Sequence, residues 1–344
     1  MSYTTSSYVI SVVIPAFNAA GCISRALDSV LSQSVSEIEI IVVDDGSIDD
    51  TQSQVARYGS RIRLIVQENR GQATARNVGI SASSGEYIAF LDADDYWLPS
   101  FLRICLKELV RHPELVAVNT AALVKKWGRP DAIVPQCQPN FAANGTHCRP
   151  LPNFFDFWAS FDHVRTGSVL IRGDVLRAAG PQLEDLWVCE DLEYWGYLAT
   201  FGPWGFIPEP LFVTDGMETA AAAGWSKKNN ARRKRCPTVE QWERRILPRL
   251  RPEDVRGFNL ARGRVARNFA HSKILIGEHA EAYEIALKYG SDFDSSWTGS
   301  AMRVAAKAGR WPWTACCALI SGREATKSLS IQTRYLMRRL RASN

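Results

Sequence analysis

The stretch Glu86-Tyr-Ile-Ala-Phe-Leu-Asp-Ala-Asp-Asp95 decides the fold of this chain. Its apolar run predicts a buried strand, which is followed at once by three acids: Asp92, Asp94 and Asp95. Carboxylates crowded past the end of a strand repel one another unless a positive charge lies among them. Hard oxygen ligands suit Mg²⁺ and Mn²⁺, and ligands of open α/β sheets bind at this end of the strands. The stretch therefore predicts a metal site at the mouth of a sheet.

Strands and helices are predicted to alternate around this stretch. The β-rich runs are residues 9–14, 38–43, 62–66 and 87–91. The segments with the apolar spacing of helices are 19–33, 51–58, 72–82 and 99–110. This alternation indicates βαβ units and a mostly parallel sheet, with the loops after the strands at one edge. Beyond residue 115 the rhythm weakens, and the expected elements are strands at 169–171, 206–207 and 211–213 and a helix at 190–201.

Composition separates the chain into an acidic and a basic part. Of its 344 residues, 46% are hydrophobic and 22% charged, as in a soluble globular protein. Residues 1–223 hold 16 Lys/Arg and 26 Asp/Glu, whereas residues 224–344 hold 25 and 10. We therefore expect a nucleotide-binding and catalytic domain over residues 1–220 and a helical, basic region over 221–344.

Several features bear on location. Met1 to Tyr8 lacks the basic and apolar regions of a signal peptide, no run reaches the roughly 18 apolar residues that span a bilayer, and the 8 cysteines show no Cys-x-x-Cys spacing. These features predict a cytoplasmic protein with reduced thiols. Peripheral contact with the inner face of the plasma membrane stays open, because Trp311-Pro312-Trp313 and the nearby arginines are typical of an anionic membrane interface. No nucleic-acid-binding module accompanies this charge, so no nucleic-acid partner is expected.

Three further segments carry candidate binding or catalytic residues. Asp44-Asp45-Gly46-Ser47 follows the second predicted strand, where it is either an ordinary turn or a nucleotide contact. Gly71 would let the backbone approach a ligand closely, and Arg76, about one helical turn later, could reach a phosphate. Glu190-Asp191 opens a predicted helix, where the acids either favour the helix dipole or include a general base.

Together these segments resemble the family 2 glycosyltransferases of the GT-A fold, over roughly residues 9–215. The motifs that carry the resemblance are Ile14-Pro15-Ala16-Phe17-Asn18, Val43-Asp44-Asp45-Gly46-Ser47 with Asp49, Asn69-Arg70-Gly71 through Ala75-Arg76-Asn77, Phe90-Leu91-Asp92-Ala93-Asp94-Asp95, and Glu190-Asp191. The resemblance implies an α/β fold with a mostly parallel central sheet flanked by helices. It also implies inverting transfer of a sugar from a nucleoside diphosphate to an acceptor hydroxyl.

The resemblance implies a role for each motif. The residues implied to hold the donor nucleotide are Pro15, Ala16, Phe17, Asn18, Asp44, Asp45, Gly71, Arg76 and Asp92. A divalent cation, Mn²⁺ or Mg²⁺, would bind Asp94 together with Asp92, and Asp191, with Glu190 beside it, would be the catalytic base. The implied partners are a nucleoside diphosphate sugar, with a UDP-sugar favoured, and an acceptor saccharide, lipid-linked or free, in bacterial surface polysaccharide or glycoconjugate synthesis.

Two other functions stay open. A sugar nucleotidyltransferase can share a similar sheet, but the Gly-rich, basic loop it needs after the first strand is not matched by Pro15 to Gly21. A non-catalytic nucleotide-sugar-binding protein is disfavoured by the intact Asp92, Asp94 and Asp191. The small-residue segment 216–230, with Trp225 and Lys227, is interpreted as a lid over the donor.

Overall fold

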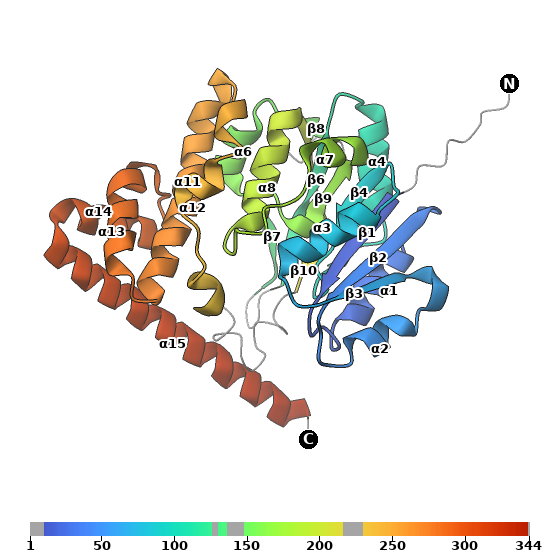
Figure 1. Cartoon of the computed structure of the whole chain (residues 1–344), viewed down its shortest axis with the longest axis horizontal. Helices are drawn as coiled ribbons and strands as arrows, with labels where there is room; N and C mark the ends of the chain where they lie inside the picture. The colour runs from blue at the N-terminus through green and yellow to red at the C-terminus, as the bar shows by residue number, and fades with distance from the viewer. Residues whose placement is uncertain (1–9, 126–129, 136–147, 216–229, 343–344) are drawn as a thin grey trace. The chain divides into compact units, whose positions relative to one another are not determined.

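The residues described by the computed structural model are 10–125, 130–135, 148–215 and 230–342, with the side chains of the last helix described as far as Thr326. They fall into two compact units: unit 1 comprises 1–184 and 194–218, and unit 2 comprises 185–193 and 219–344 (Figure 1). The piece 185–193, which contains Glu190-Asp191, thus groups with the helices of unit 2. The expected boundary at 220 and the predicted lid with Trp225 and Lys227 lie outside the described residues.

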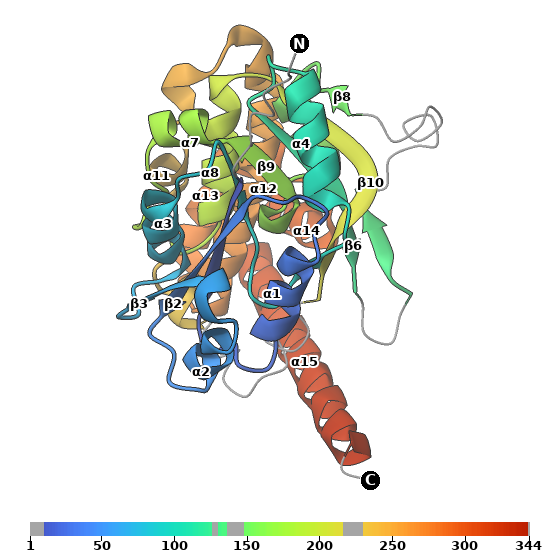
Figure 2. The same cartoon turned by 90° about the vertical axis from the view of Figure 1, so that its right-hand side faces the viewer.

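Unit 1 contains a mixed sheet that has ten strands in the described part of the chain (Figure 1 and Figure 2). The strands are β1 (Ile10–Ala16), β2 (Ile38–Asp45), β3 (Arg63–Gln67), β4 (Tyr87–Phe90), β5 (Tyr96–Trp97), β6 (Ala117–Val124), β7 (Ala132–Val134), β8 (Arg149–Pro150), β9 (Val169–Arg172) and β10 (Trp204–Thr214). The main path runs β3-β2-β1-β4-β9-β6-β10-β5. The first four strands are parallel, as predicted, whereas β9 is antiparallel to both of its neighbours.

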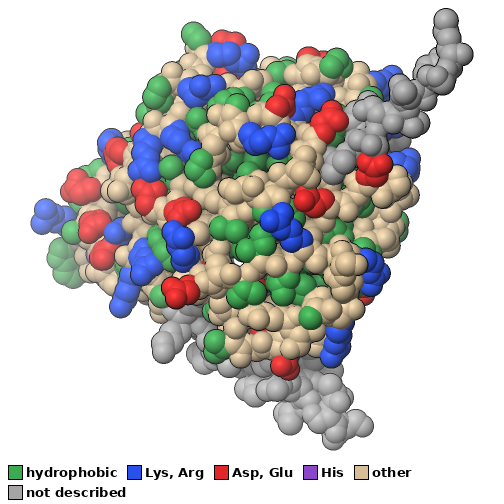
Figure 3. All heavy atoms as spheres, turned by 45° about the vertical axis from the view of Figure 1, so that its right-hand side comes forward, with side chains coloured by type: hydrophobic (Ala, Val, Ile, Leu, Met, Phe, Trp, Pro, Cys, Tyr) green, Lys and Arg blue, Asp and Glu red, His purple; other side chains and the backbone are tan. Residues whose placement is uncertain are grey.

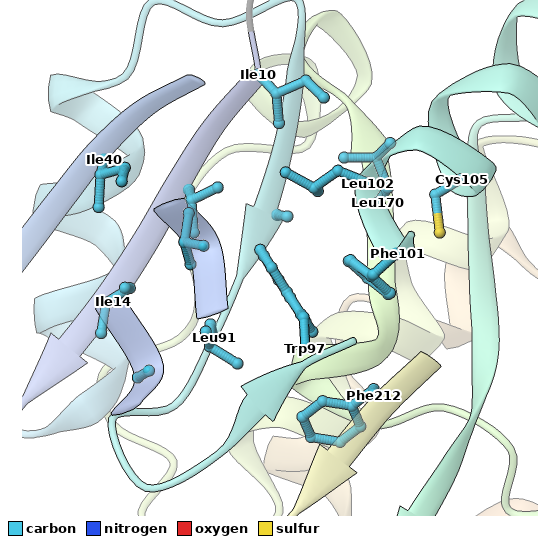
Figure 4. Close-up of a cluster of buried hydrophobic side chains, with 14 of the residues drawn as sticks. Ile10, Ile14, Ile40, Leu91, Trp97, Phe101, Leu102, Cys105, Leu170 and Phe212 are labelled. Carbon is cyan, nitrogen blue, oxygen red and sulfur yellow. The ribbon is translucent and has the colours of Figure 1, made fainter. Parts of the chain in front are cut away.

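Helices cover both faces of this sheet. They are α1 (Ile23–Leu31), α2 (Thr51–Ala56), α3 (Gln72–Ala82), α4 (Phe101–Arg111), α6 (Phe154–Phe161) and α7 (Gly173–Ala179), with α8 (Glu190–Leu198) divided between the two units. Alternate residues of a strand face opposite sides. Val42 therefore joins the large core cluster shared with α1 and α4, part of which Figure 4 shows, whereas Ile41 and Val43 pack with Ala75 of α3. Burial on both sides explains the continuous apolar runs that predict β1, β2 and β4.

Among the strands that differ from the sequence prediction, which include the short β5, β7 and β8, the longest are β6 and β10. β6 was not expected because its sequence, Ala-Val-Asn-Thr-Ala-Ala-Leu-Val, is poor in β-forming residues. It forms between β9 and β10, where pairing on both edges and burial override the local preference. β10 is one strand of 11 residues where two short strands were expected. Its register against β6 shifts on both sides of Pro210, so the prolines make an irregularity without ending the strand.

Unit 2 is helical, as predicted for the C-terminal region. Its main helices are α11 (Val239–Glu243), α12 (Val255–Leu275), α13 (His279–Tyr289), α14 (Trp297–Ala308) and α15 (Arg310–Ala342). Trp242 and Phe258 are fully buried and stack with their ring centroids 6.0 Å apart. Beside them Arg262 bonds to Glu243 at 3.2 Å and to Asp292 at 3.4 Å. Part of the basic composition is thus paired within the unit.

The charged surface is mixed. On the face drawn in Figure 3, Lys and Arg side chains are interspersed with Asp and Glu side chains, and hydrophobic side chains occur singly or in small groups. Among the described helices, none combines the length and the apolar character needed to cross a membrane.

The contact between α3 and β1 generates a stability prediction. A Cβ atom at Gly79 would lie 2.2 Å from Cγ1 of Val13, which is fully buried. Because a β-branched side chain has little rotamer freedom, we expect Gly79→Ala to lower the free energy of unfolding by about 1–3 kcal/mol, measured by denaturant unfolding. Gly21→Ala is the matched control, because a Cβ there meets nothing within 4 Å. Equal unfolding midpoints for the two variants would contradict this account of the packing.

Candidate active site

The loops that follow β1 and β2 are joined by hydrogen bonds. The register of the two strands pairs Ala16 with Asp44, so the loops leave the sheet side by side. The backbone N–H of Asn18 donates to Oγ of Ser47 at 2.9 Å. The Ser47 hydroxyl in turn donates to the fully buried Asp44 carboxylate, which also accepts from Nε2 of Gln52 at 2.7 Å. Asp44 therefore fixes the loop that holds the exposed Asn18.

Asp45 shapes the turn that leads into α3. Its carboxylate, 4% exposed, accepts from Nε2 of Gln67 at 2.7 Å and from the backbone N–H groups of Arg70 and Gly71 at 2.8 and 2.9 Å. Gly71 has φ of 96°, a conformation that costs a side-chain-bearing residue energy. Asp45 therefore stabilises the glycine turn from which α3 starts.

Asp92 is held by the beginning of α3. Nε2 of Gln72 and Nη2 of Arg76 donate to its Oδ1 at 3.0 and 2.8 Å. The Arg76 side chain is 2% exposed, whereas that of Asp92 is 28% exposed. Nε and Nη1 of Arg76 are buried and make no hydrogen bond to the described residues. A buried guanidinium with unused donors is suited to an anionic ligand that enters beside Asp92.

The rest of the acidic loop is fixed by α1 and by the end of β10. Arg25 donates through Nη2 to the backbone carbonyl of Asp94 at 2.7 Å, and its Nη1 pairs with Asp215 at 2.8 Å. The backbone N–H of Asp215 donates to Oδ1 of Asp95 at 2.9 Å. Burial, together with the charges of Asp92 and Asp94, raises the pKa of Asp95 to about 8. The loop therefore carries negative charge that a cation would relieve.

The donor set fits a cation that takes most of its ligands from elsewhere. Asp92 and Asp94 are both partly exposed at the end of β4. Within the described ranges, no group of three or more His, Cys, Asp or Glu side chains could hold a metal ion. Mg²⁺ is typically bound by one or two carboxylates with phosphate oxygens and waters completing its shell. Asp92 and Asp94 would hold such an ion in company with a diphosphate.

In unit 2, Glu190 and Asp191 follow a strained residue at the start of α8. Cys189 has φ of 59°, and its carbonyl accepts from Nε1 of Trp242 at 3.1 Å. Left-handed backbone in a residue other than glycine costs energy and persists only where its surroundings impose it. Glu190, 6% exposed, bonds to Nη2 of Arg232 at 2.8 Å. Asp191 is half-buried, and its carboxylate accepts from the adjacent Leu192 N–H at 2.8 Å.

Unit 1 thus gathers the residues predicted for the donor and the metal at the carboxyl ends of β1, β2 and β4 and the start of α3. These residues are Pro15 and Ala16, which are buried in β1, Phe17 and Asn18, which follow it, and Asp44, Asp45, Gly71, Arg76, Asp92 and Asp94. Glu190 and Asp191 belong to unit 2. The individual roles of all these residues stay predictions.

Residues 11–161, which include this whole constellation in unit 1, match the family model described as glycosyl transferase family 2. The chain carries a family 2 glycosyltransferase domain. The prediction of the family is thereby confirmed.

Several relatives resemble about a third of the chain. Chondroitin synthase of Pasteurella multocida (strain Pm70) is 39% identical over 115 residues, 33% of this chain and 12% of that protein. The Escherichia coli UDP-Glc:alpha-D-GlcNAc-diphosphoundecaprenol beta-1,3-glucosyltransferase WfgD is 34% identical over 134 residues, 37% of this chain and 53% of that protein. The putative glycosyltransferase EpsH of Bacillus subtilis is 36% identical over 123 residues, 35% of this chain and 36% of that protein. The matches thus span little more than half of these relatives at most.

Solved glycosyltransferase structures share the fold. S. aureus TarS 1-349 in complex with UDP-GlcNAc matches with a TM-score of 0.53 and 17% identity, covering 88% of this chain and 92% of that one. The mannosyltransferase PcManGT from Pyrobaculum calidifontis, in complex with GDP-Man and Mn²⁺, matches with a TM-score of 0.52 and 21% identity, covering 98% and 88%. At these identities the likeness shows the fold alone. It confirms the predicted GT-A class.

The residues that sequence reasoning missed include three that hold the acidic loop after β4. Gln72 donates a hydrogen bond to Asp92, as Arg76 does. Arg25 and Asp215, which are 190 positions apart in the sequence, pair with each other and fix the acidic loop. Gln72 was identifiable in principle, since it lies four residues before Arg76 and so on the same helix face. The pairing of Arg25 with Asp215 had no local signal.

The buried acid of the glycine turn gives a prediction for the family 2 domain. Asp45→Ala leaves the donors on Gln67, Arg70 and Gly71 without their acceptor, so we expect the free energy of unfolding to fall by about 2–4 kcal/mol. Asp50→Ala is the matched control, because Asp50 is exposed and its side chain makes no capping hydrogen bond. Denaturant unfolding measures both variants, and an Asp45→Ala midpoint equal to that of the control would show that the turn does not need the carboxylate.

Proposed function

We propose that this chain is an inverting glycosyltransferase that moves a sugar from a nucleoside diphosphate donor to an acceptor hydroxyl with the help of Mn²⁺ or Mg²⁺. A UDP-sugar is the favoured donor. The observation that carries the proposal is the end of β4, where a buried Arg76 with unused donors pairs with the partly exposed Asp92, two residues before the partly exposed Asp94. Carboxylates suited to a cation and a guanidinium suited to an anion would together hold a metal-bound diphosphate there. The family 2 domain over residues 11–161 supports the same chemistry.

On the donor side, each group has a physical task. A divalent cation bound by Asp92 and Asp94 would offset the negative charge that develops on the leaving diphosphate. Arg76 would donate to a phosphate oxygen while its Nη2 keeps Asp92 in place. The loops after β1 and β2, which contain Pro15–Asn18 and Asp44–Asp45, would enclose the nucleoside, with Gly71 allowing close backbone approach.

On the acceptor side, Asp191 would take the proton of the attacking hydroxyl. Glu190 is committed to its ion pair with Arg232, whereas Asp191 has the more exposed carboxylate of the two. A base that assists attack from the face opposite the leaving group gives inversion by direct displacement. Glu190 would position the first turn of α8, so that its part in catalysis is indirect.

The acceptor and setting follow from the relatives only by analogy. The name of WfgD states a diphosphoundecaprenol-linked acceptor for that enzyme, and chondroitin synthase makes a polysaccharide. For this chain we propose a saccharide acceptor, lipid-linked or free, and a role in cytoplasmic synthesis of surface polysaccharide or glycoconjugate. Residues 1–220 would act as the catalytic domain, and residues 221–344 as a helical region that supplies further contacts.

The metal-bridged donor site predicts coupled binding. In a panel of nucleoside diphosphate sugars, one donor should raise the melting temperature with Mn²⁺ and fail to do so with EDTA, because the cation neutralises the diphosphate. Asp94→Ala should abolish this shift. Asp174→Ala, which removes an exposed acid at the start of α7, should leave it intact. If the donor still raises the melting temperature in EDTA, or in Asp94→Ala, the metal is removed from the proposal.

The base assignment predicts a separation of binding from turnover. Asp191→Asn should keep the metal-dependent donor shift and slow nucleoside diphosphate release by about 10²–10⁴-fold, the usual worth of general-base assistance. Glu190→Gln, which retains an oxygen acceptor for Arg232, should lose far less. Full turnover by Asp191→Asn would exclude Asp191 as the base. Donor binding without turnover in the unaltered chain, with water or any saccharide supplied, would favour a non-catalytic binding protein.

A further inference from the structure

Helices α14 and α15 form an antiparallel hairpin in unit 2. Gly309, with φ of 107°, separates the end of α14 from the start of α15. Trp297 is the first residue of α14, and Arg323 lies in the fourth turn of α15. The guanidinium of Arg323 is 4.6 Å from the centroid of the Trp297 ring. The beginning of one helix therefore lies beside the interior of the other, and the two run in opposite directions.

One side of α15 is buried and the other is open. Between Arg310 and Thr326, the part of α15 whose side chains are described, the buried residues are Trp313, Cys316, Cys317 and Ile320. Trp313 is 4% exposed and donates through Nε1 to the carbonyl of His279 at 3.0 Å, so it belongs to the core of unit 2.

The open side carries an apolar stripe at helical spacing. Its members, which we call the α15 stripe, are Trp311, Ala315, Ala318, Leu319 and Gly322, all exposed. Trp311 is 88% exposed and Leu319 is 59% exposed, and Val304 on the neighbouring α14 is 67% exposed. Large apolar side chains gathered on one helix face usually mark a surface that contacts something. The small residues between them would let a flat partner approach closely.

Along the sequence of α14 and the described part of α15, the charge has one sign as far as Arg323. Residues 295–323 contain four Lys/Arg and no Asp or Glu. Lys307, Arg310 and Arg323 are exposed. The next acid, Glu324, is 3.8 Å from Arg233, which offsets its charge. In sequence, residues 325–342 add five Lys/Arg and again no acid.

We propose that the α15 stripe docks on an anionic lipid surface, with Trp311 and Leu319 inserted at the interface and Lys307, Arg310 and Arg323 near the headgroups. An exposed tryptophan in a helix that also carries cations matches the amphipathic pattern of interfacial helices. A second copy of the chain is disfavoured, because a two-fold contact through this face would bring like charges together. Nucleic acid is disfavoured, because it would be bound mainly through contacts to its phosphates, and these contacts would not bury the apolar side chains of the stripe. The inference goes beyond the proposed sugar transfer, and its test needs neither donor nor acceptor.

The test is co-sedimentation of the full chain with vesicles of phosphatidylcholine containing phosphatidylglycerol, compared with vesicles of phosphatidylcholine alone. We expect binding to the anionic vesicles at low salt that weakens as salt rises. Trp311→Ala should weaken it about tenfold, the order expected when one aromatic side chain no longer inserts. Leu287→Ala, which removes another exposed apolar side chain of unit 2, on α13, is the control and should bind as the unaltered chain does.

A charge reversal tests the electrostatic part. Lys307→Glu should weaken vesicle binding more than Arg256→Glu, which changes the net charge equally at an exposed position of α12. Unchanged melting temperatures show that the variants are folded. The proposal is overturned if Trp311→Ala weakens vesicle binding no more than Leu287→Ala does, and Lys307→Glu no more than Arg256→Glu does. It also fails if the unaltered chain binds neutral vesicles as well as anionic ones, or binds no vesicles at low salt. It is also overturned if Trp311→Ala leaves vesicle binding intact while removing self-association or binding to a nucleic-acid oligomer.

Discussion

The need to offset the carboxylates at the end of β2 and at the end of β4 is the constraint on which unit 1 depends. Like charges a few ångströms apart in a poorly solvated site cost several kcal/mol unless donors face them. Asp44 accepts from Gln52 of α2, and Asp45 accepts from Gln67 at the end of β3 and from the N–H of Arg70. Asp92 is paired with Arg76, and Asp95 accepts a backbone N–H and has a raised pKa. The loops around the site are therefore ordered by the acids they surround.

This arrangement divides acids that look equivalent in the sequence. The carboxylates of Asp44 and Asp45 are at most 4% exposed and are occupied by hydrogen bonds within the chain. The side chains of Asp92 and Asp94 reach the surface. A ligand at this site would meet the second pair directly, whereas the first pair would act on it through the backbone that it positions. Removing a buried acid should therefore disturb folding first, and removing an exposed one should disturb binding first.

The predictable part of the fold is the part with local signals. β1, β2 and β4 follow from continuous apolar runs, because these strands are buried, whereas the edge strand β3 is partly exposed. α1 to α4 follow from the apolar spacing of helices. The acids at the strand ends predict the site because parallel strands bring those ends together. β6 forms despite an unfavourable composition, since its neighbours supply the pairing. The contact of Arg25 with Asp215 joins residues 190 positions apart, which no pattern along the chain encodes.

In unit 2, the number of basic residues does not by itself show where the surface is positively charged. Arg245 bonds to Glu193 through two nitrogens, and Arg262 bonds to two acids, so these arginines contribute to packing with their charge offset. Ion pairs of this kind add little to the field that a distant partner feels. Residues 295–323 differ because no acid occurs among them. The electrostatic field outside unit 2 should therefore be most positive where the basic residues have no acids near them in the sequence. The number of arginines in a segment matters less.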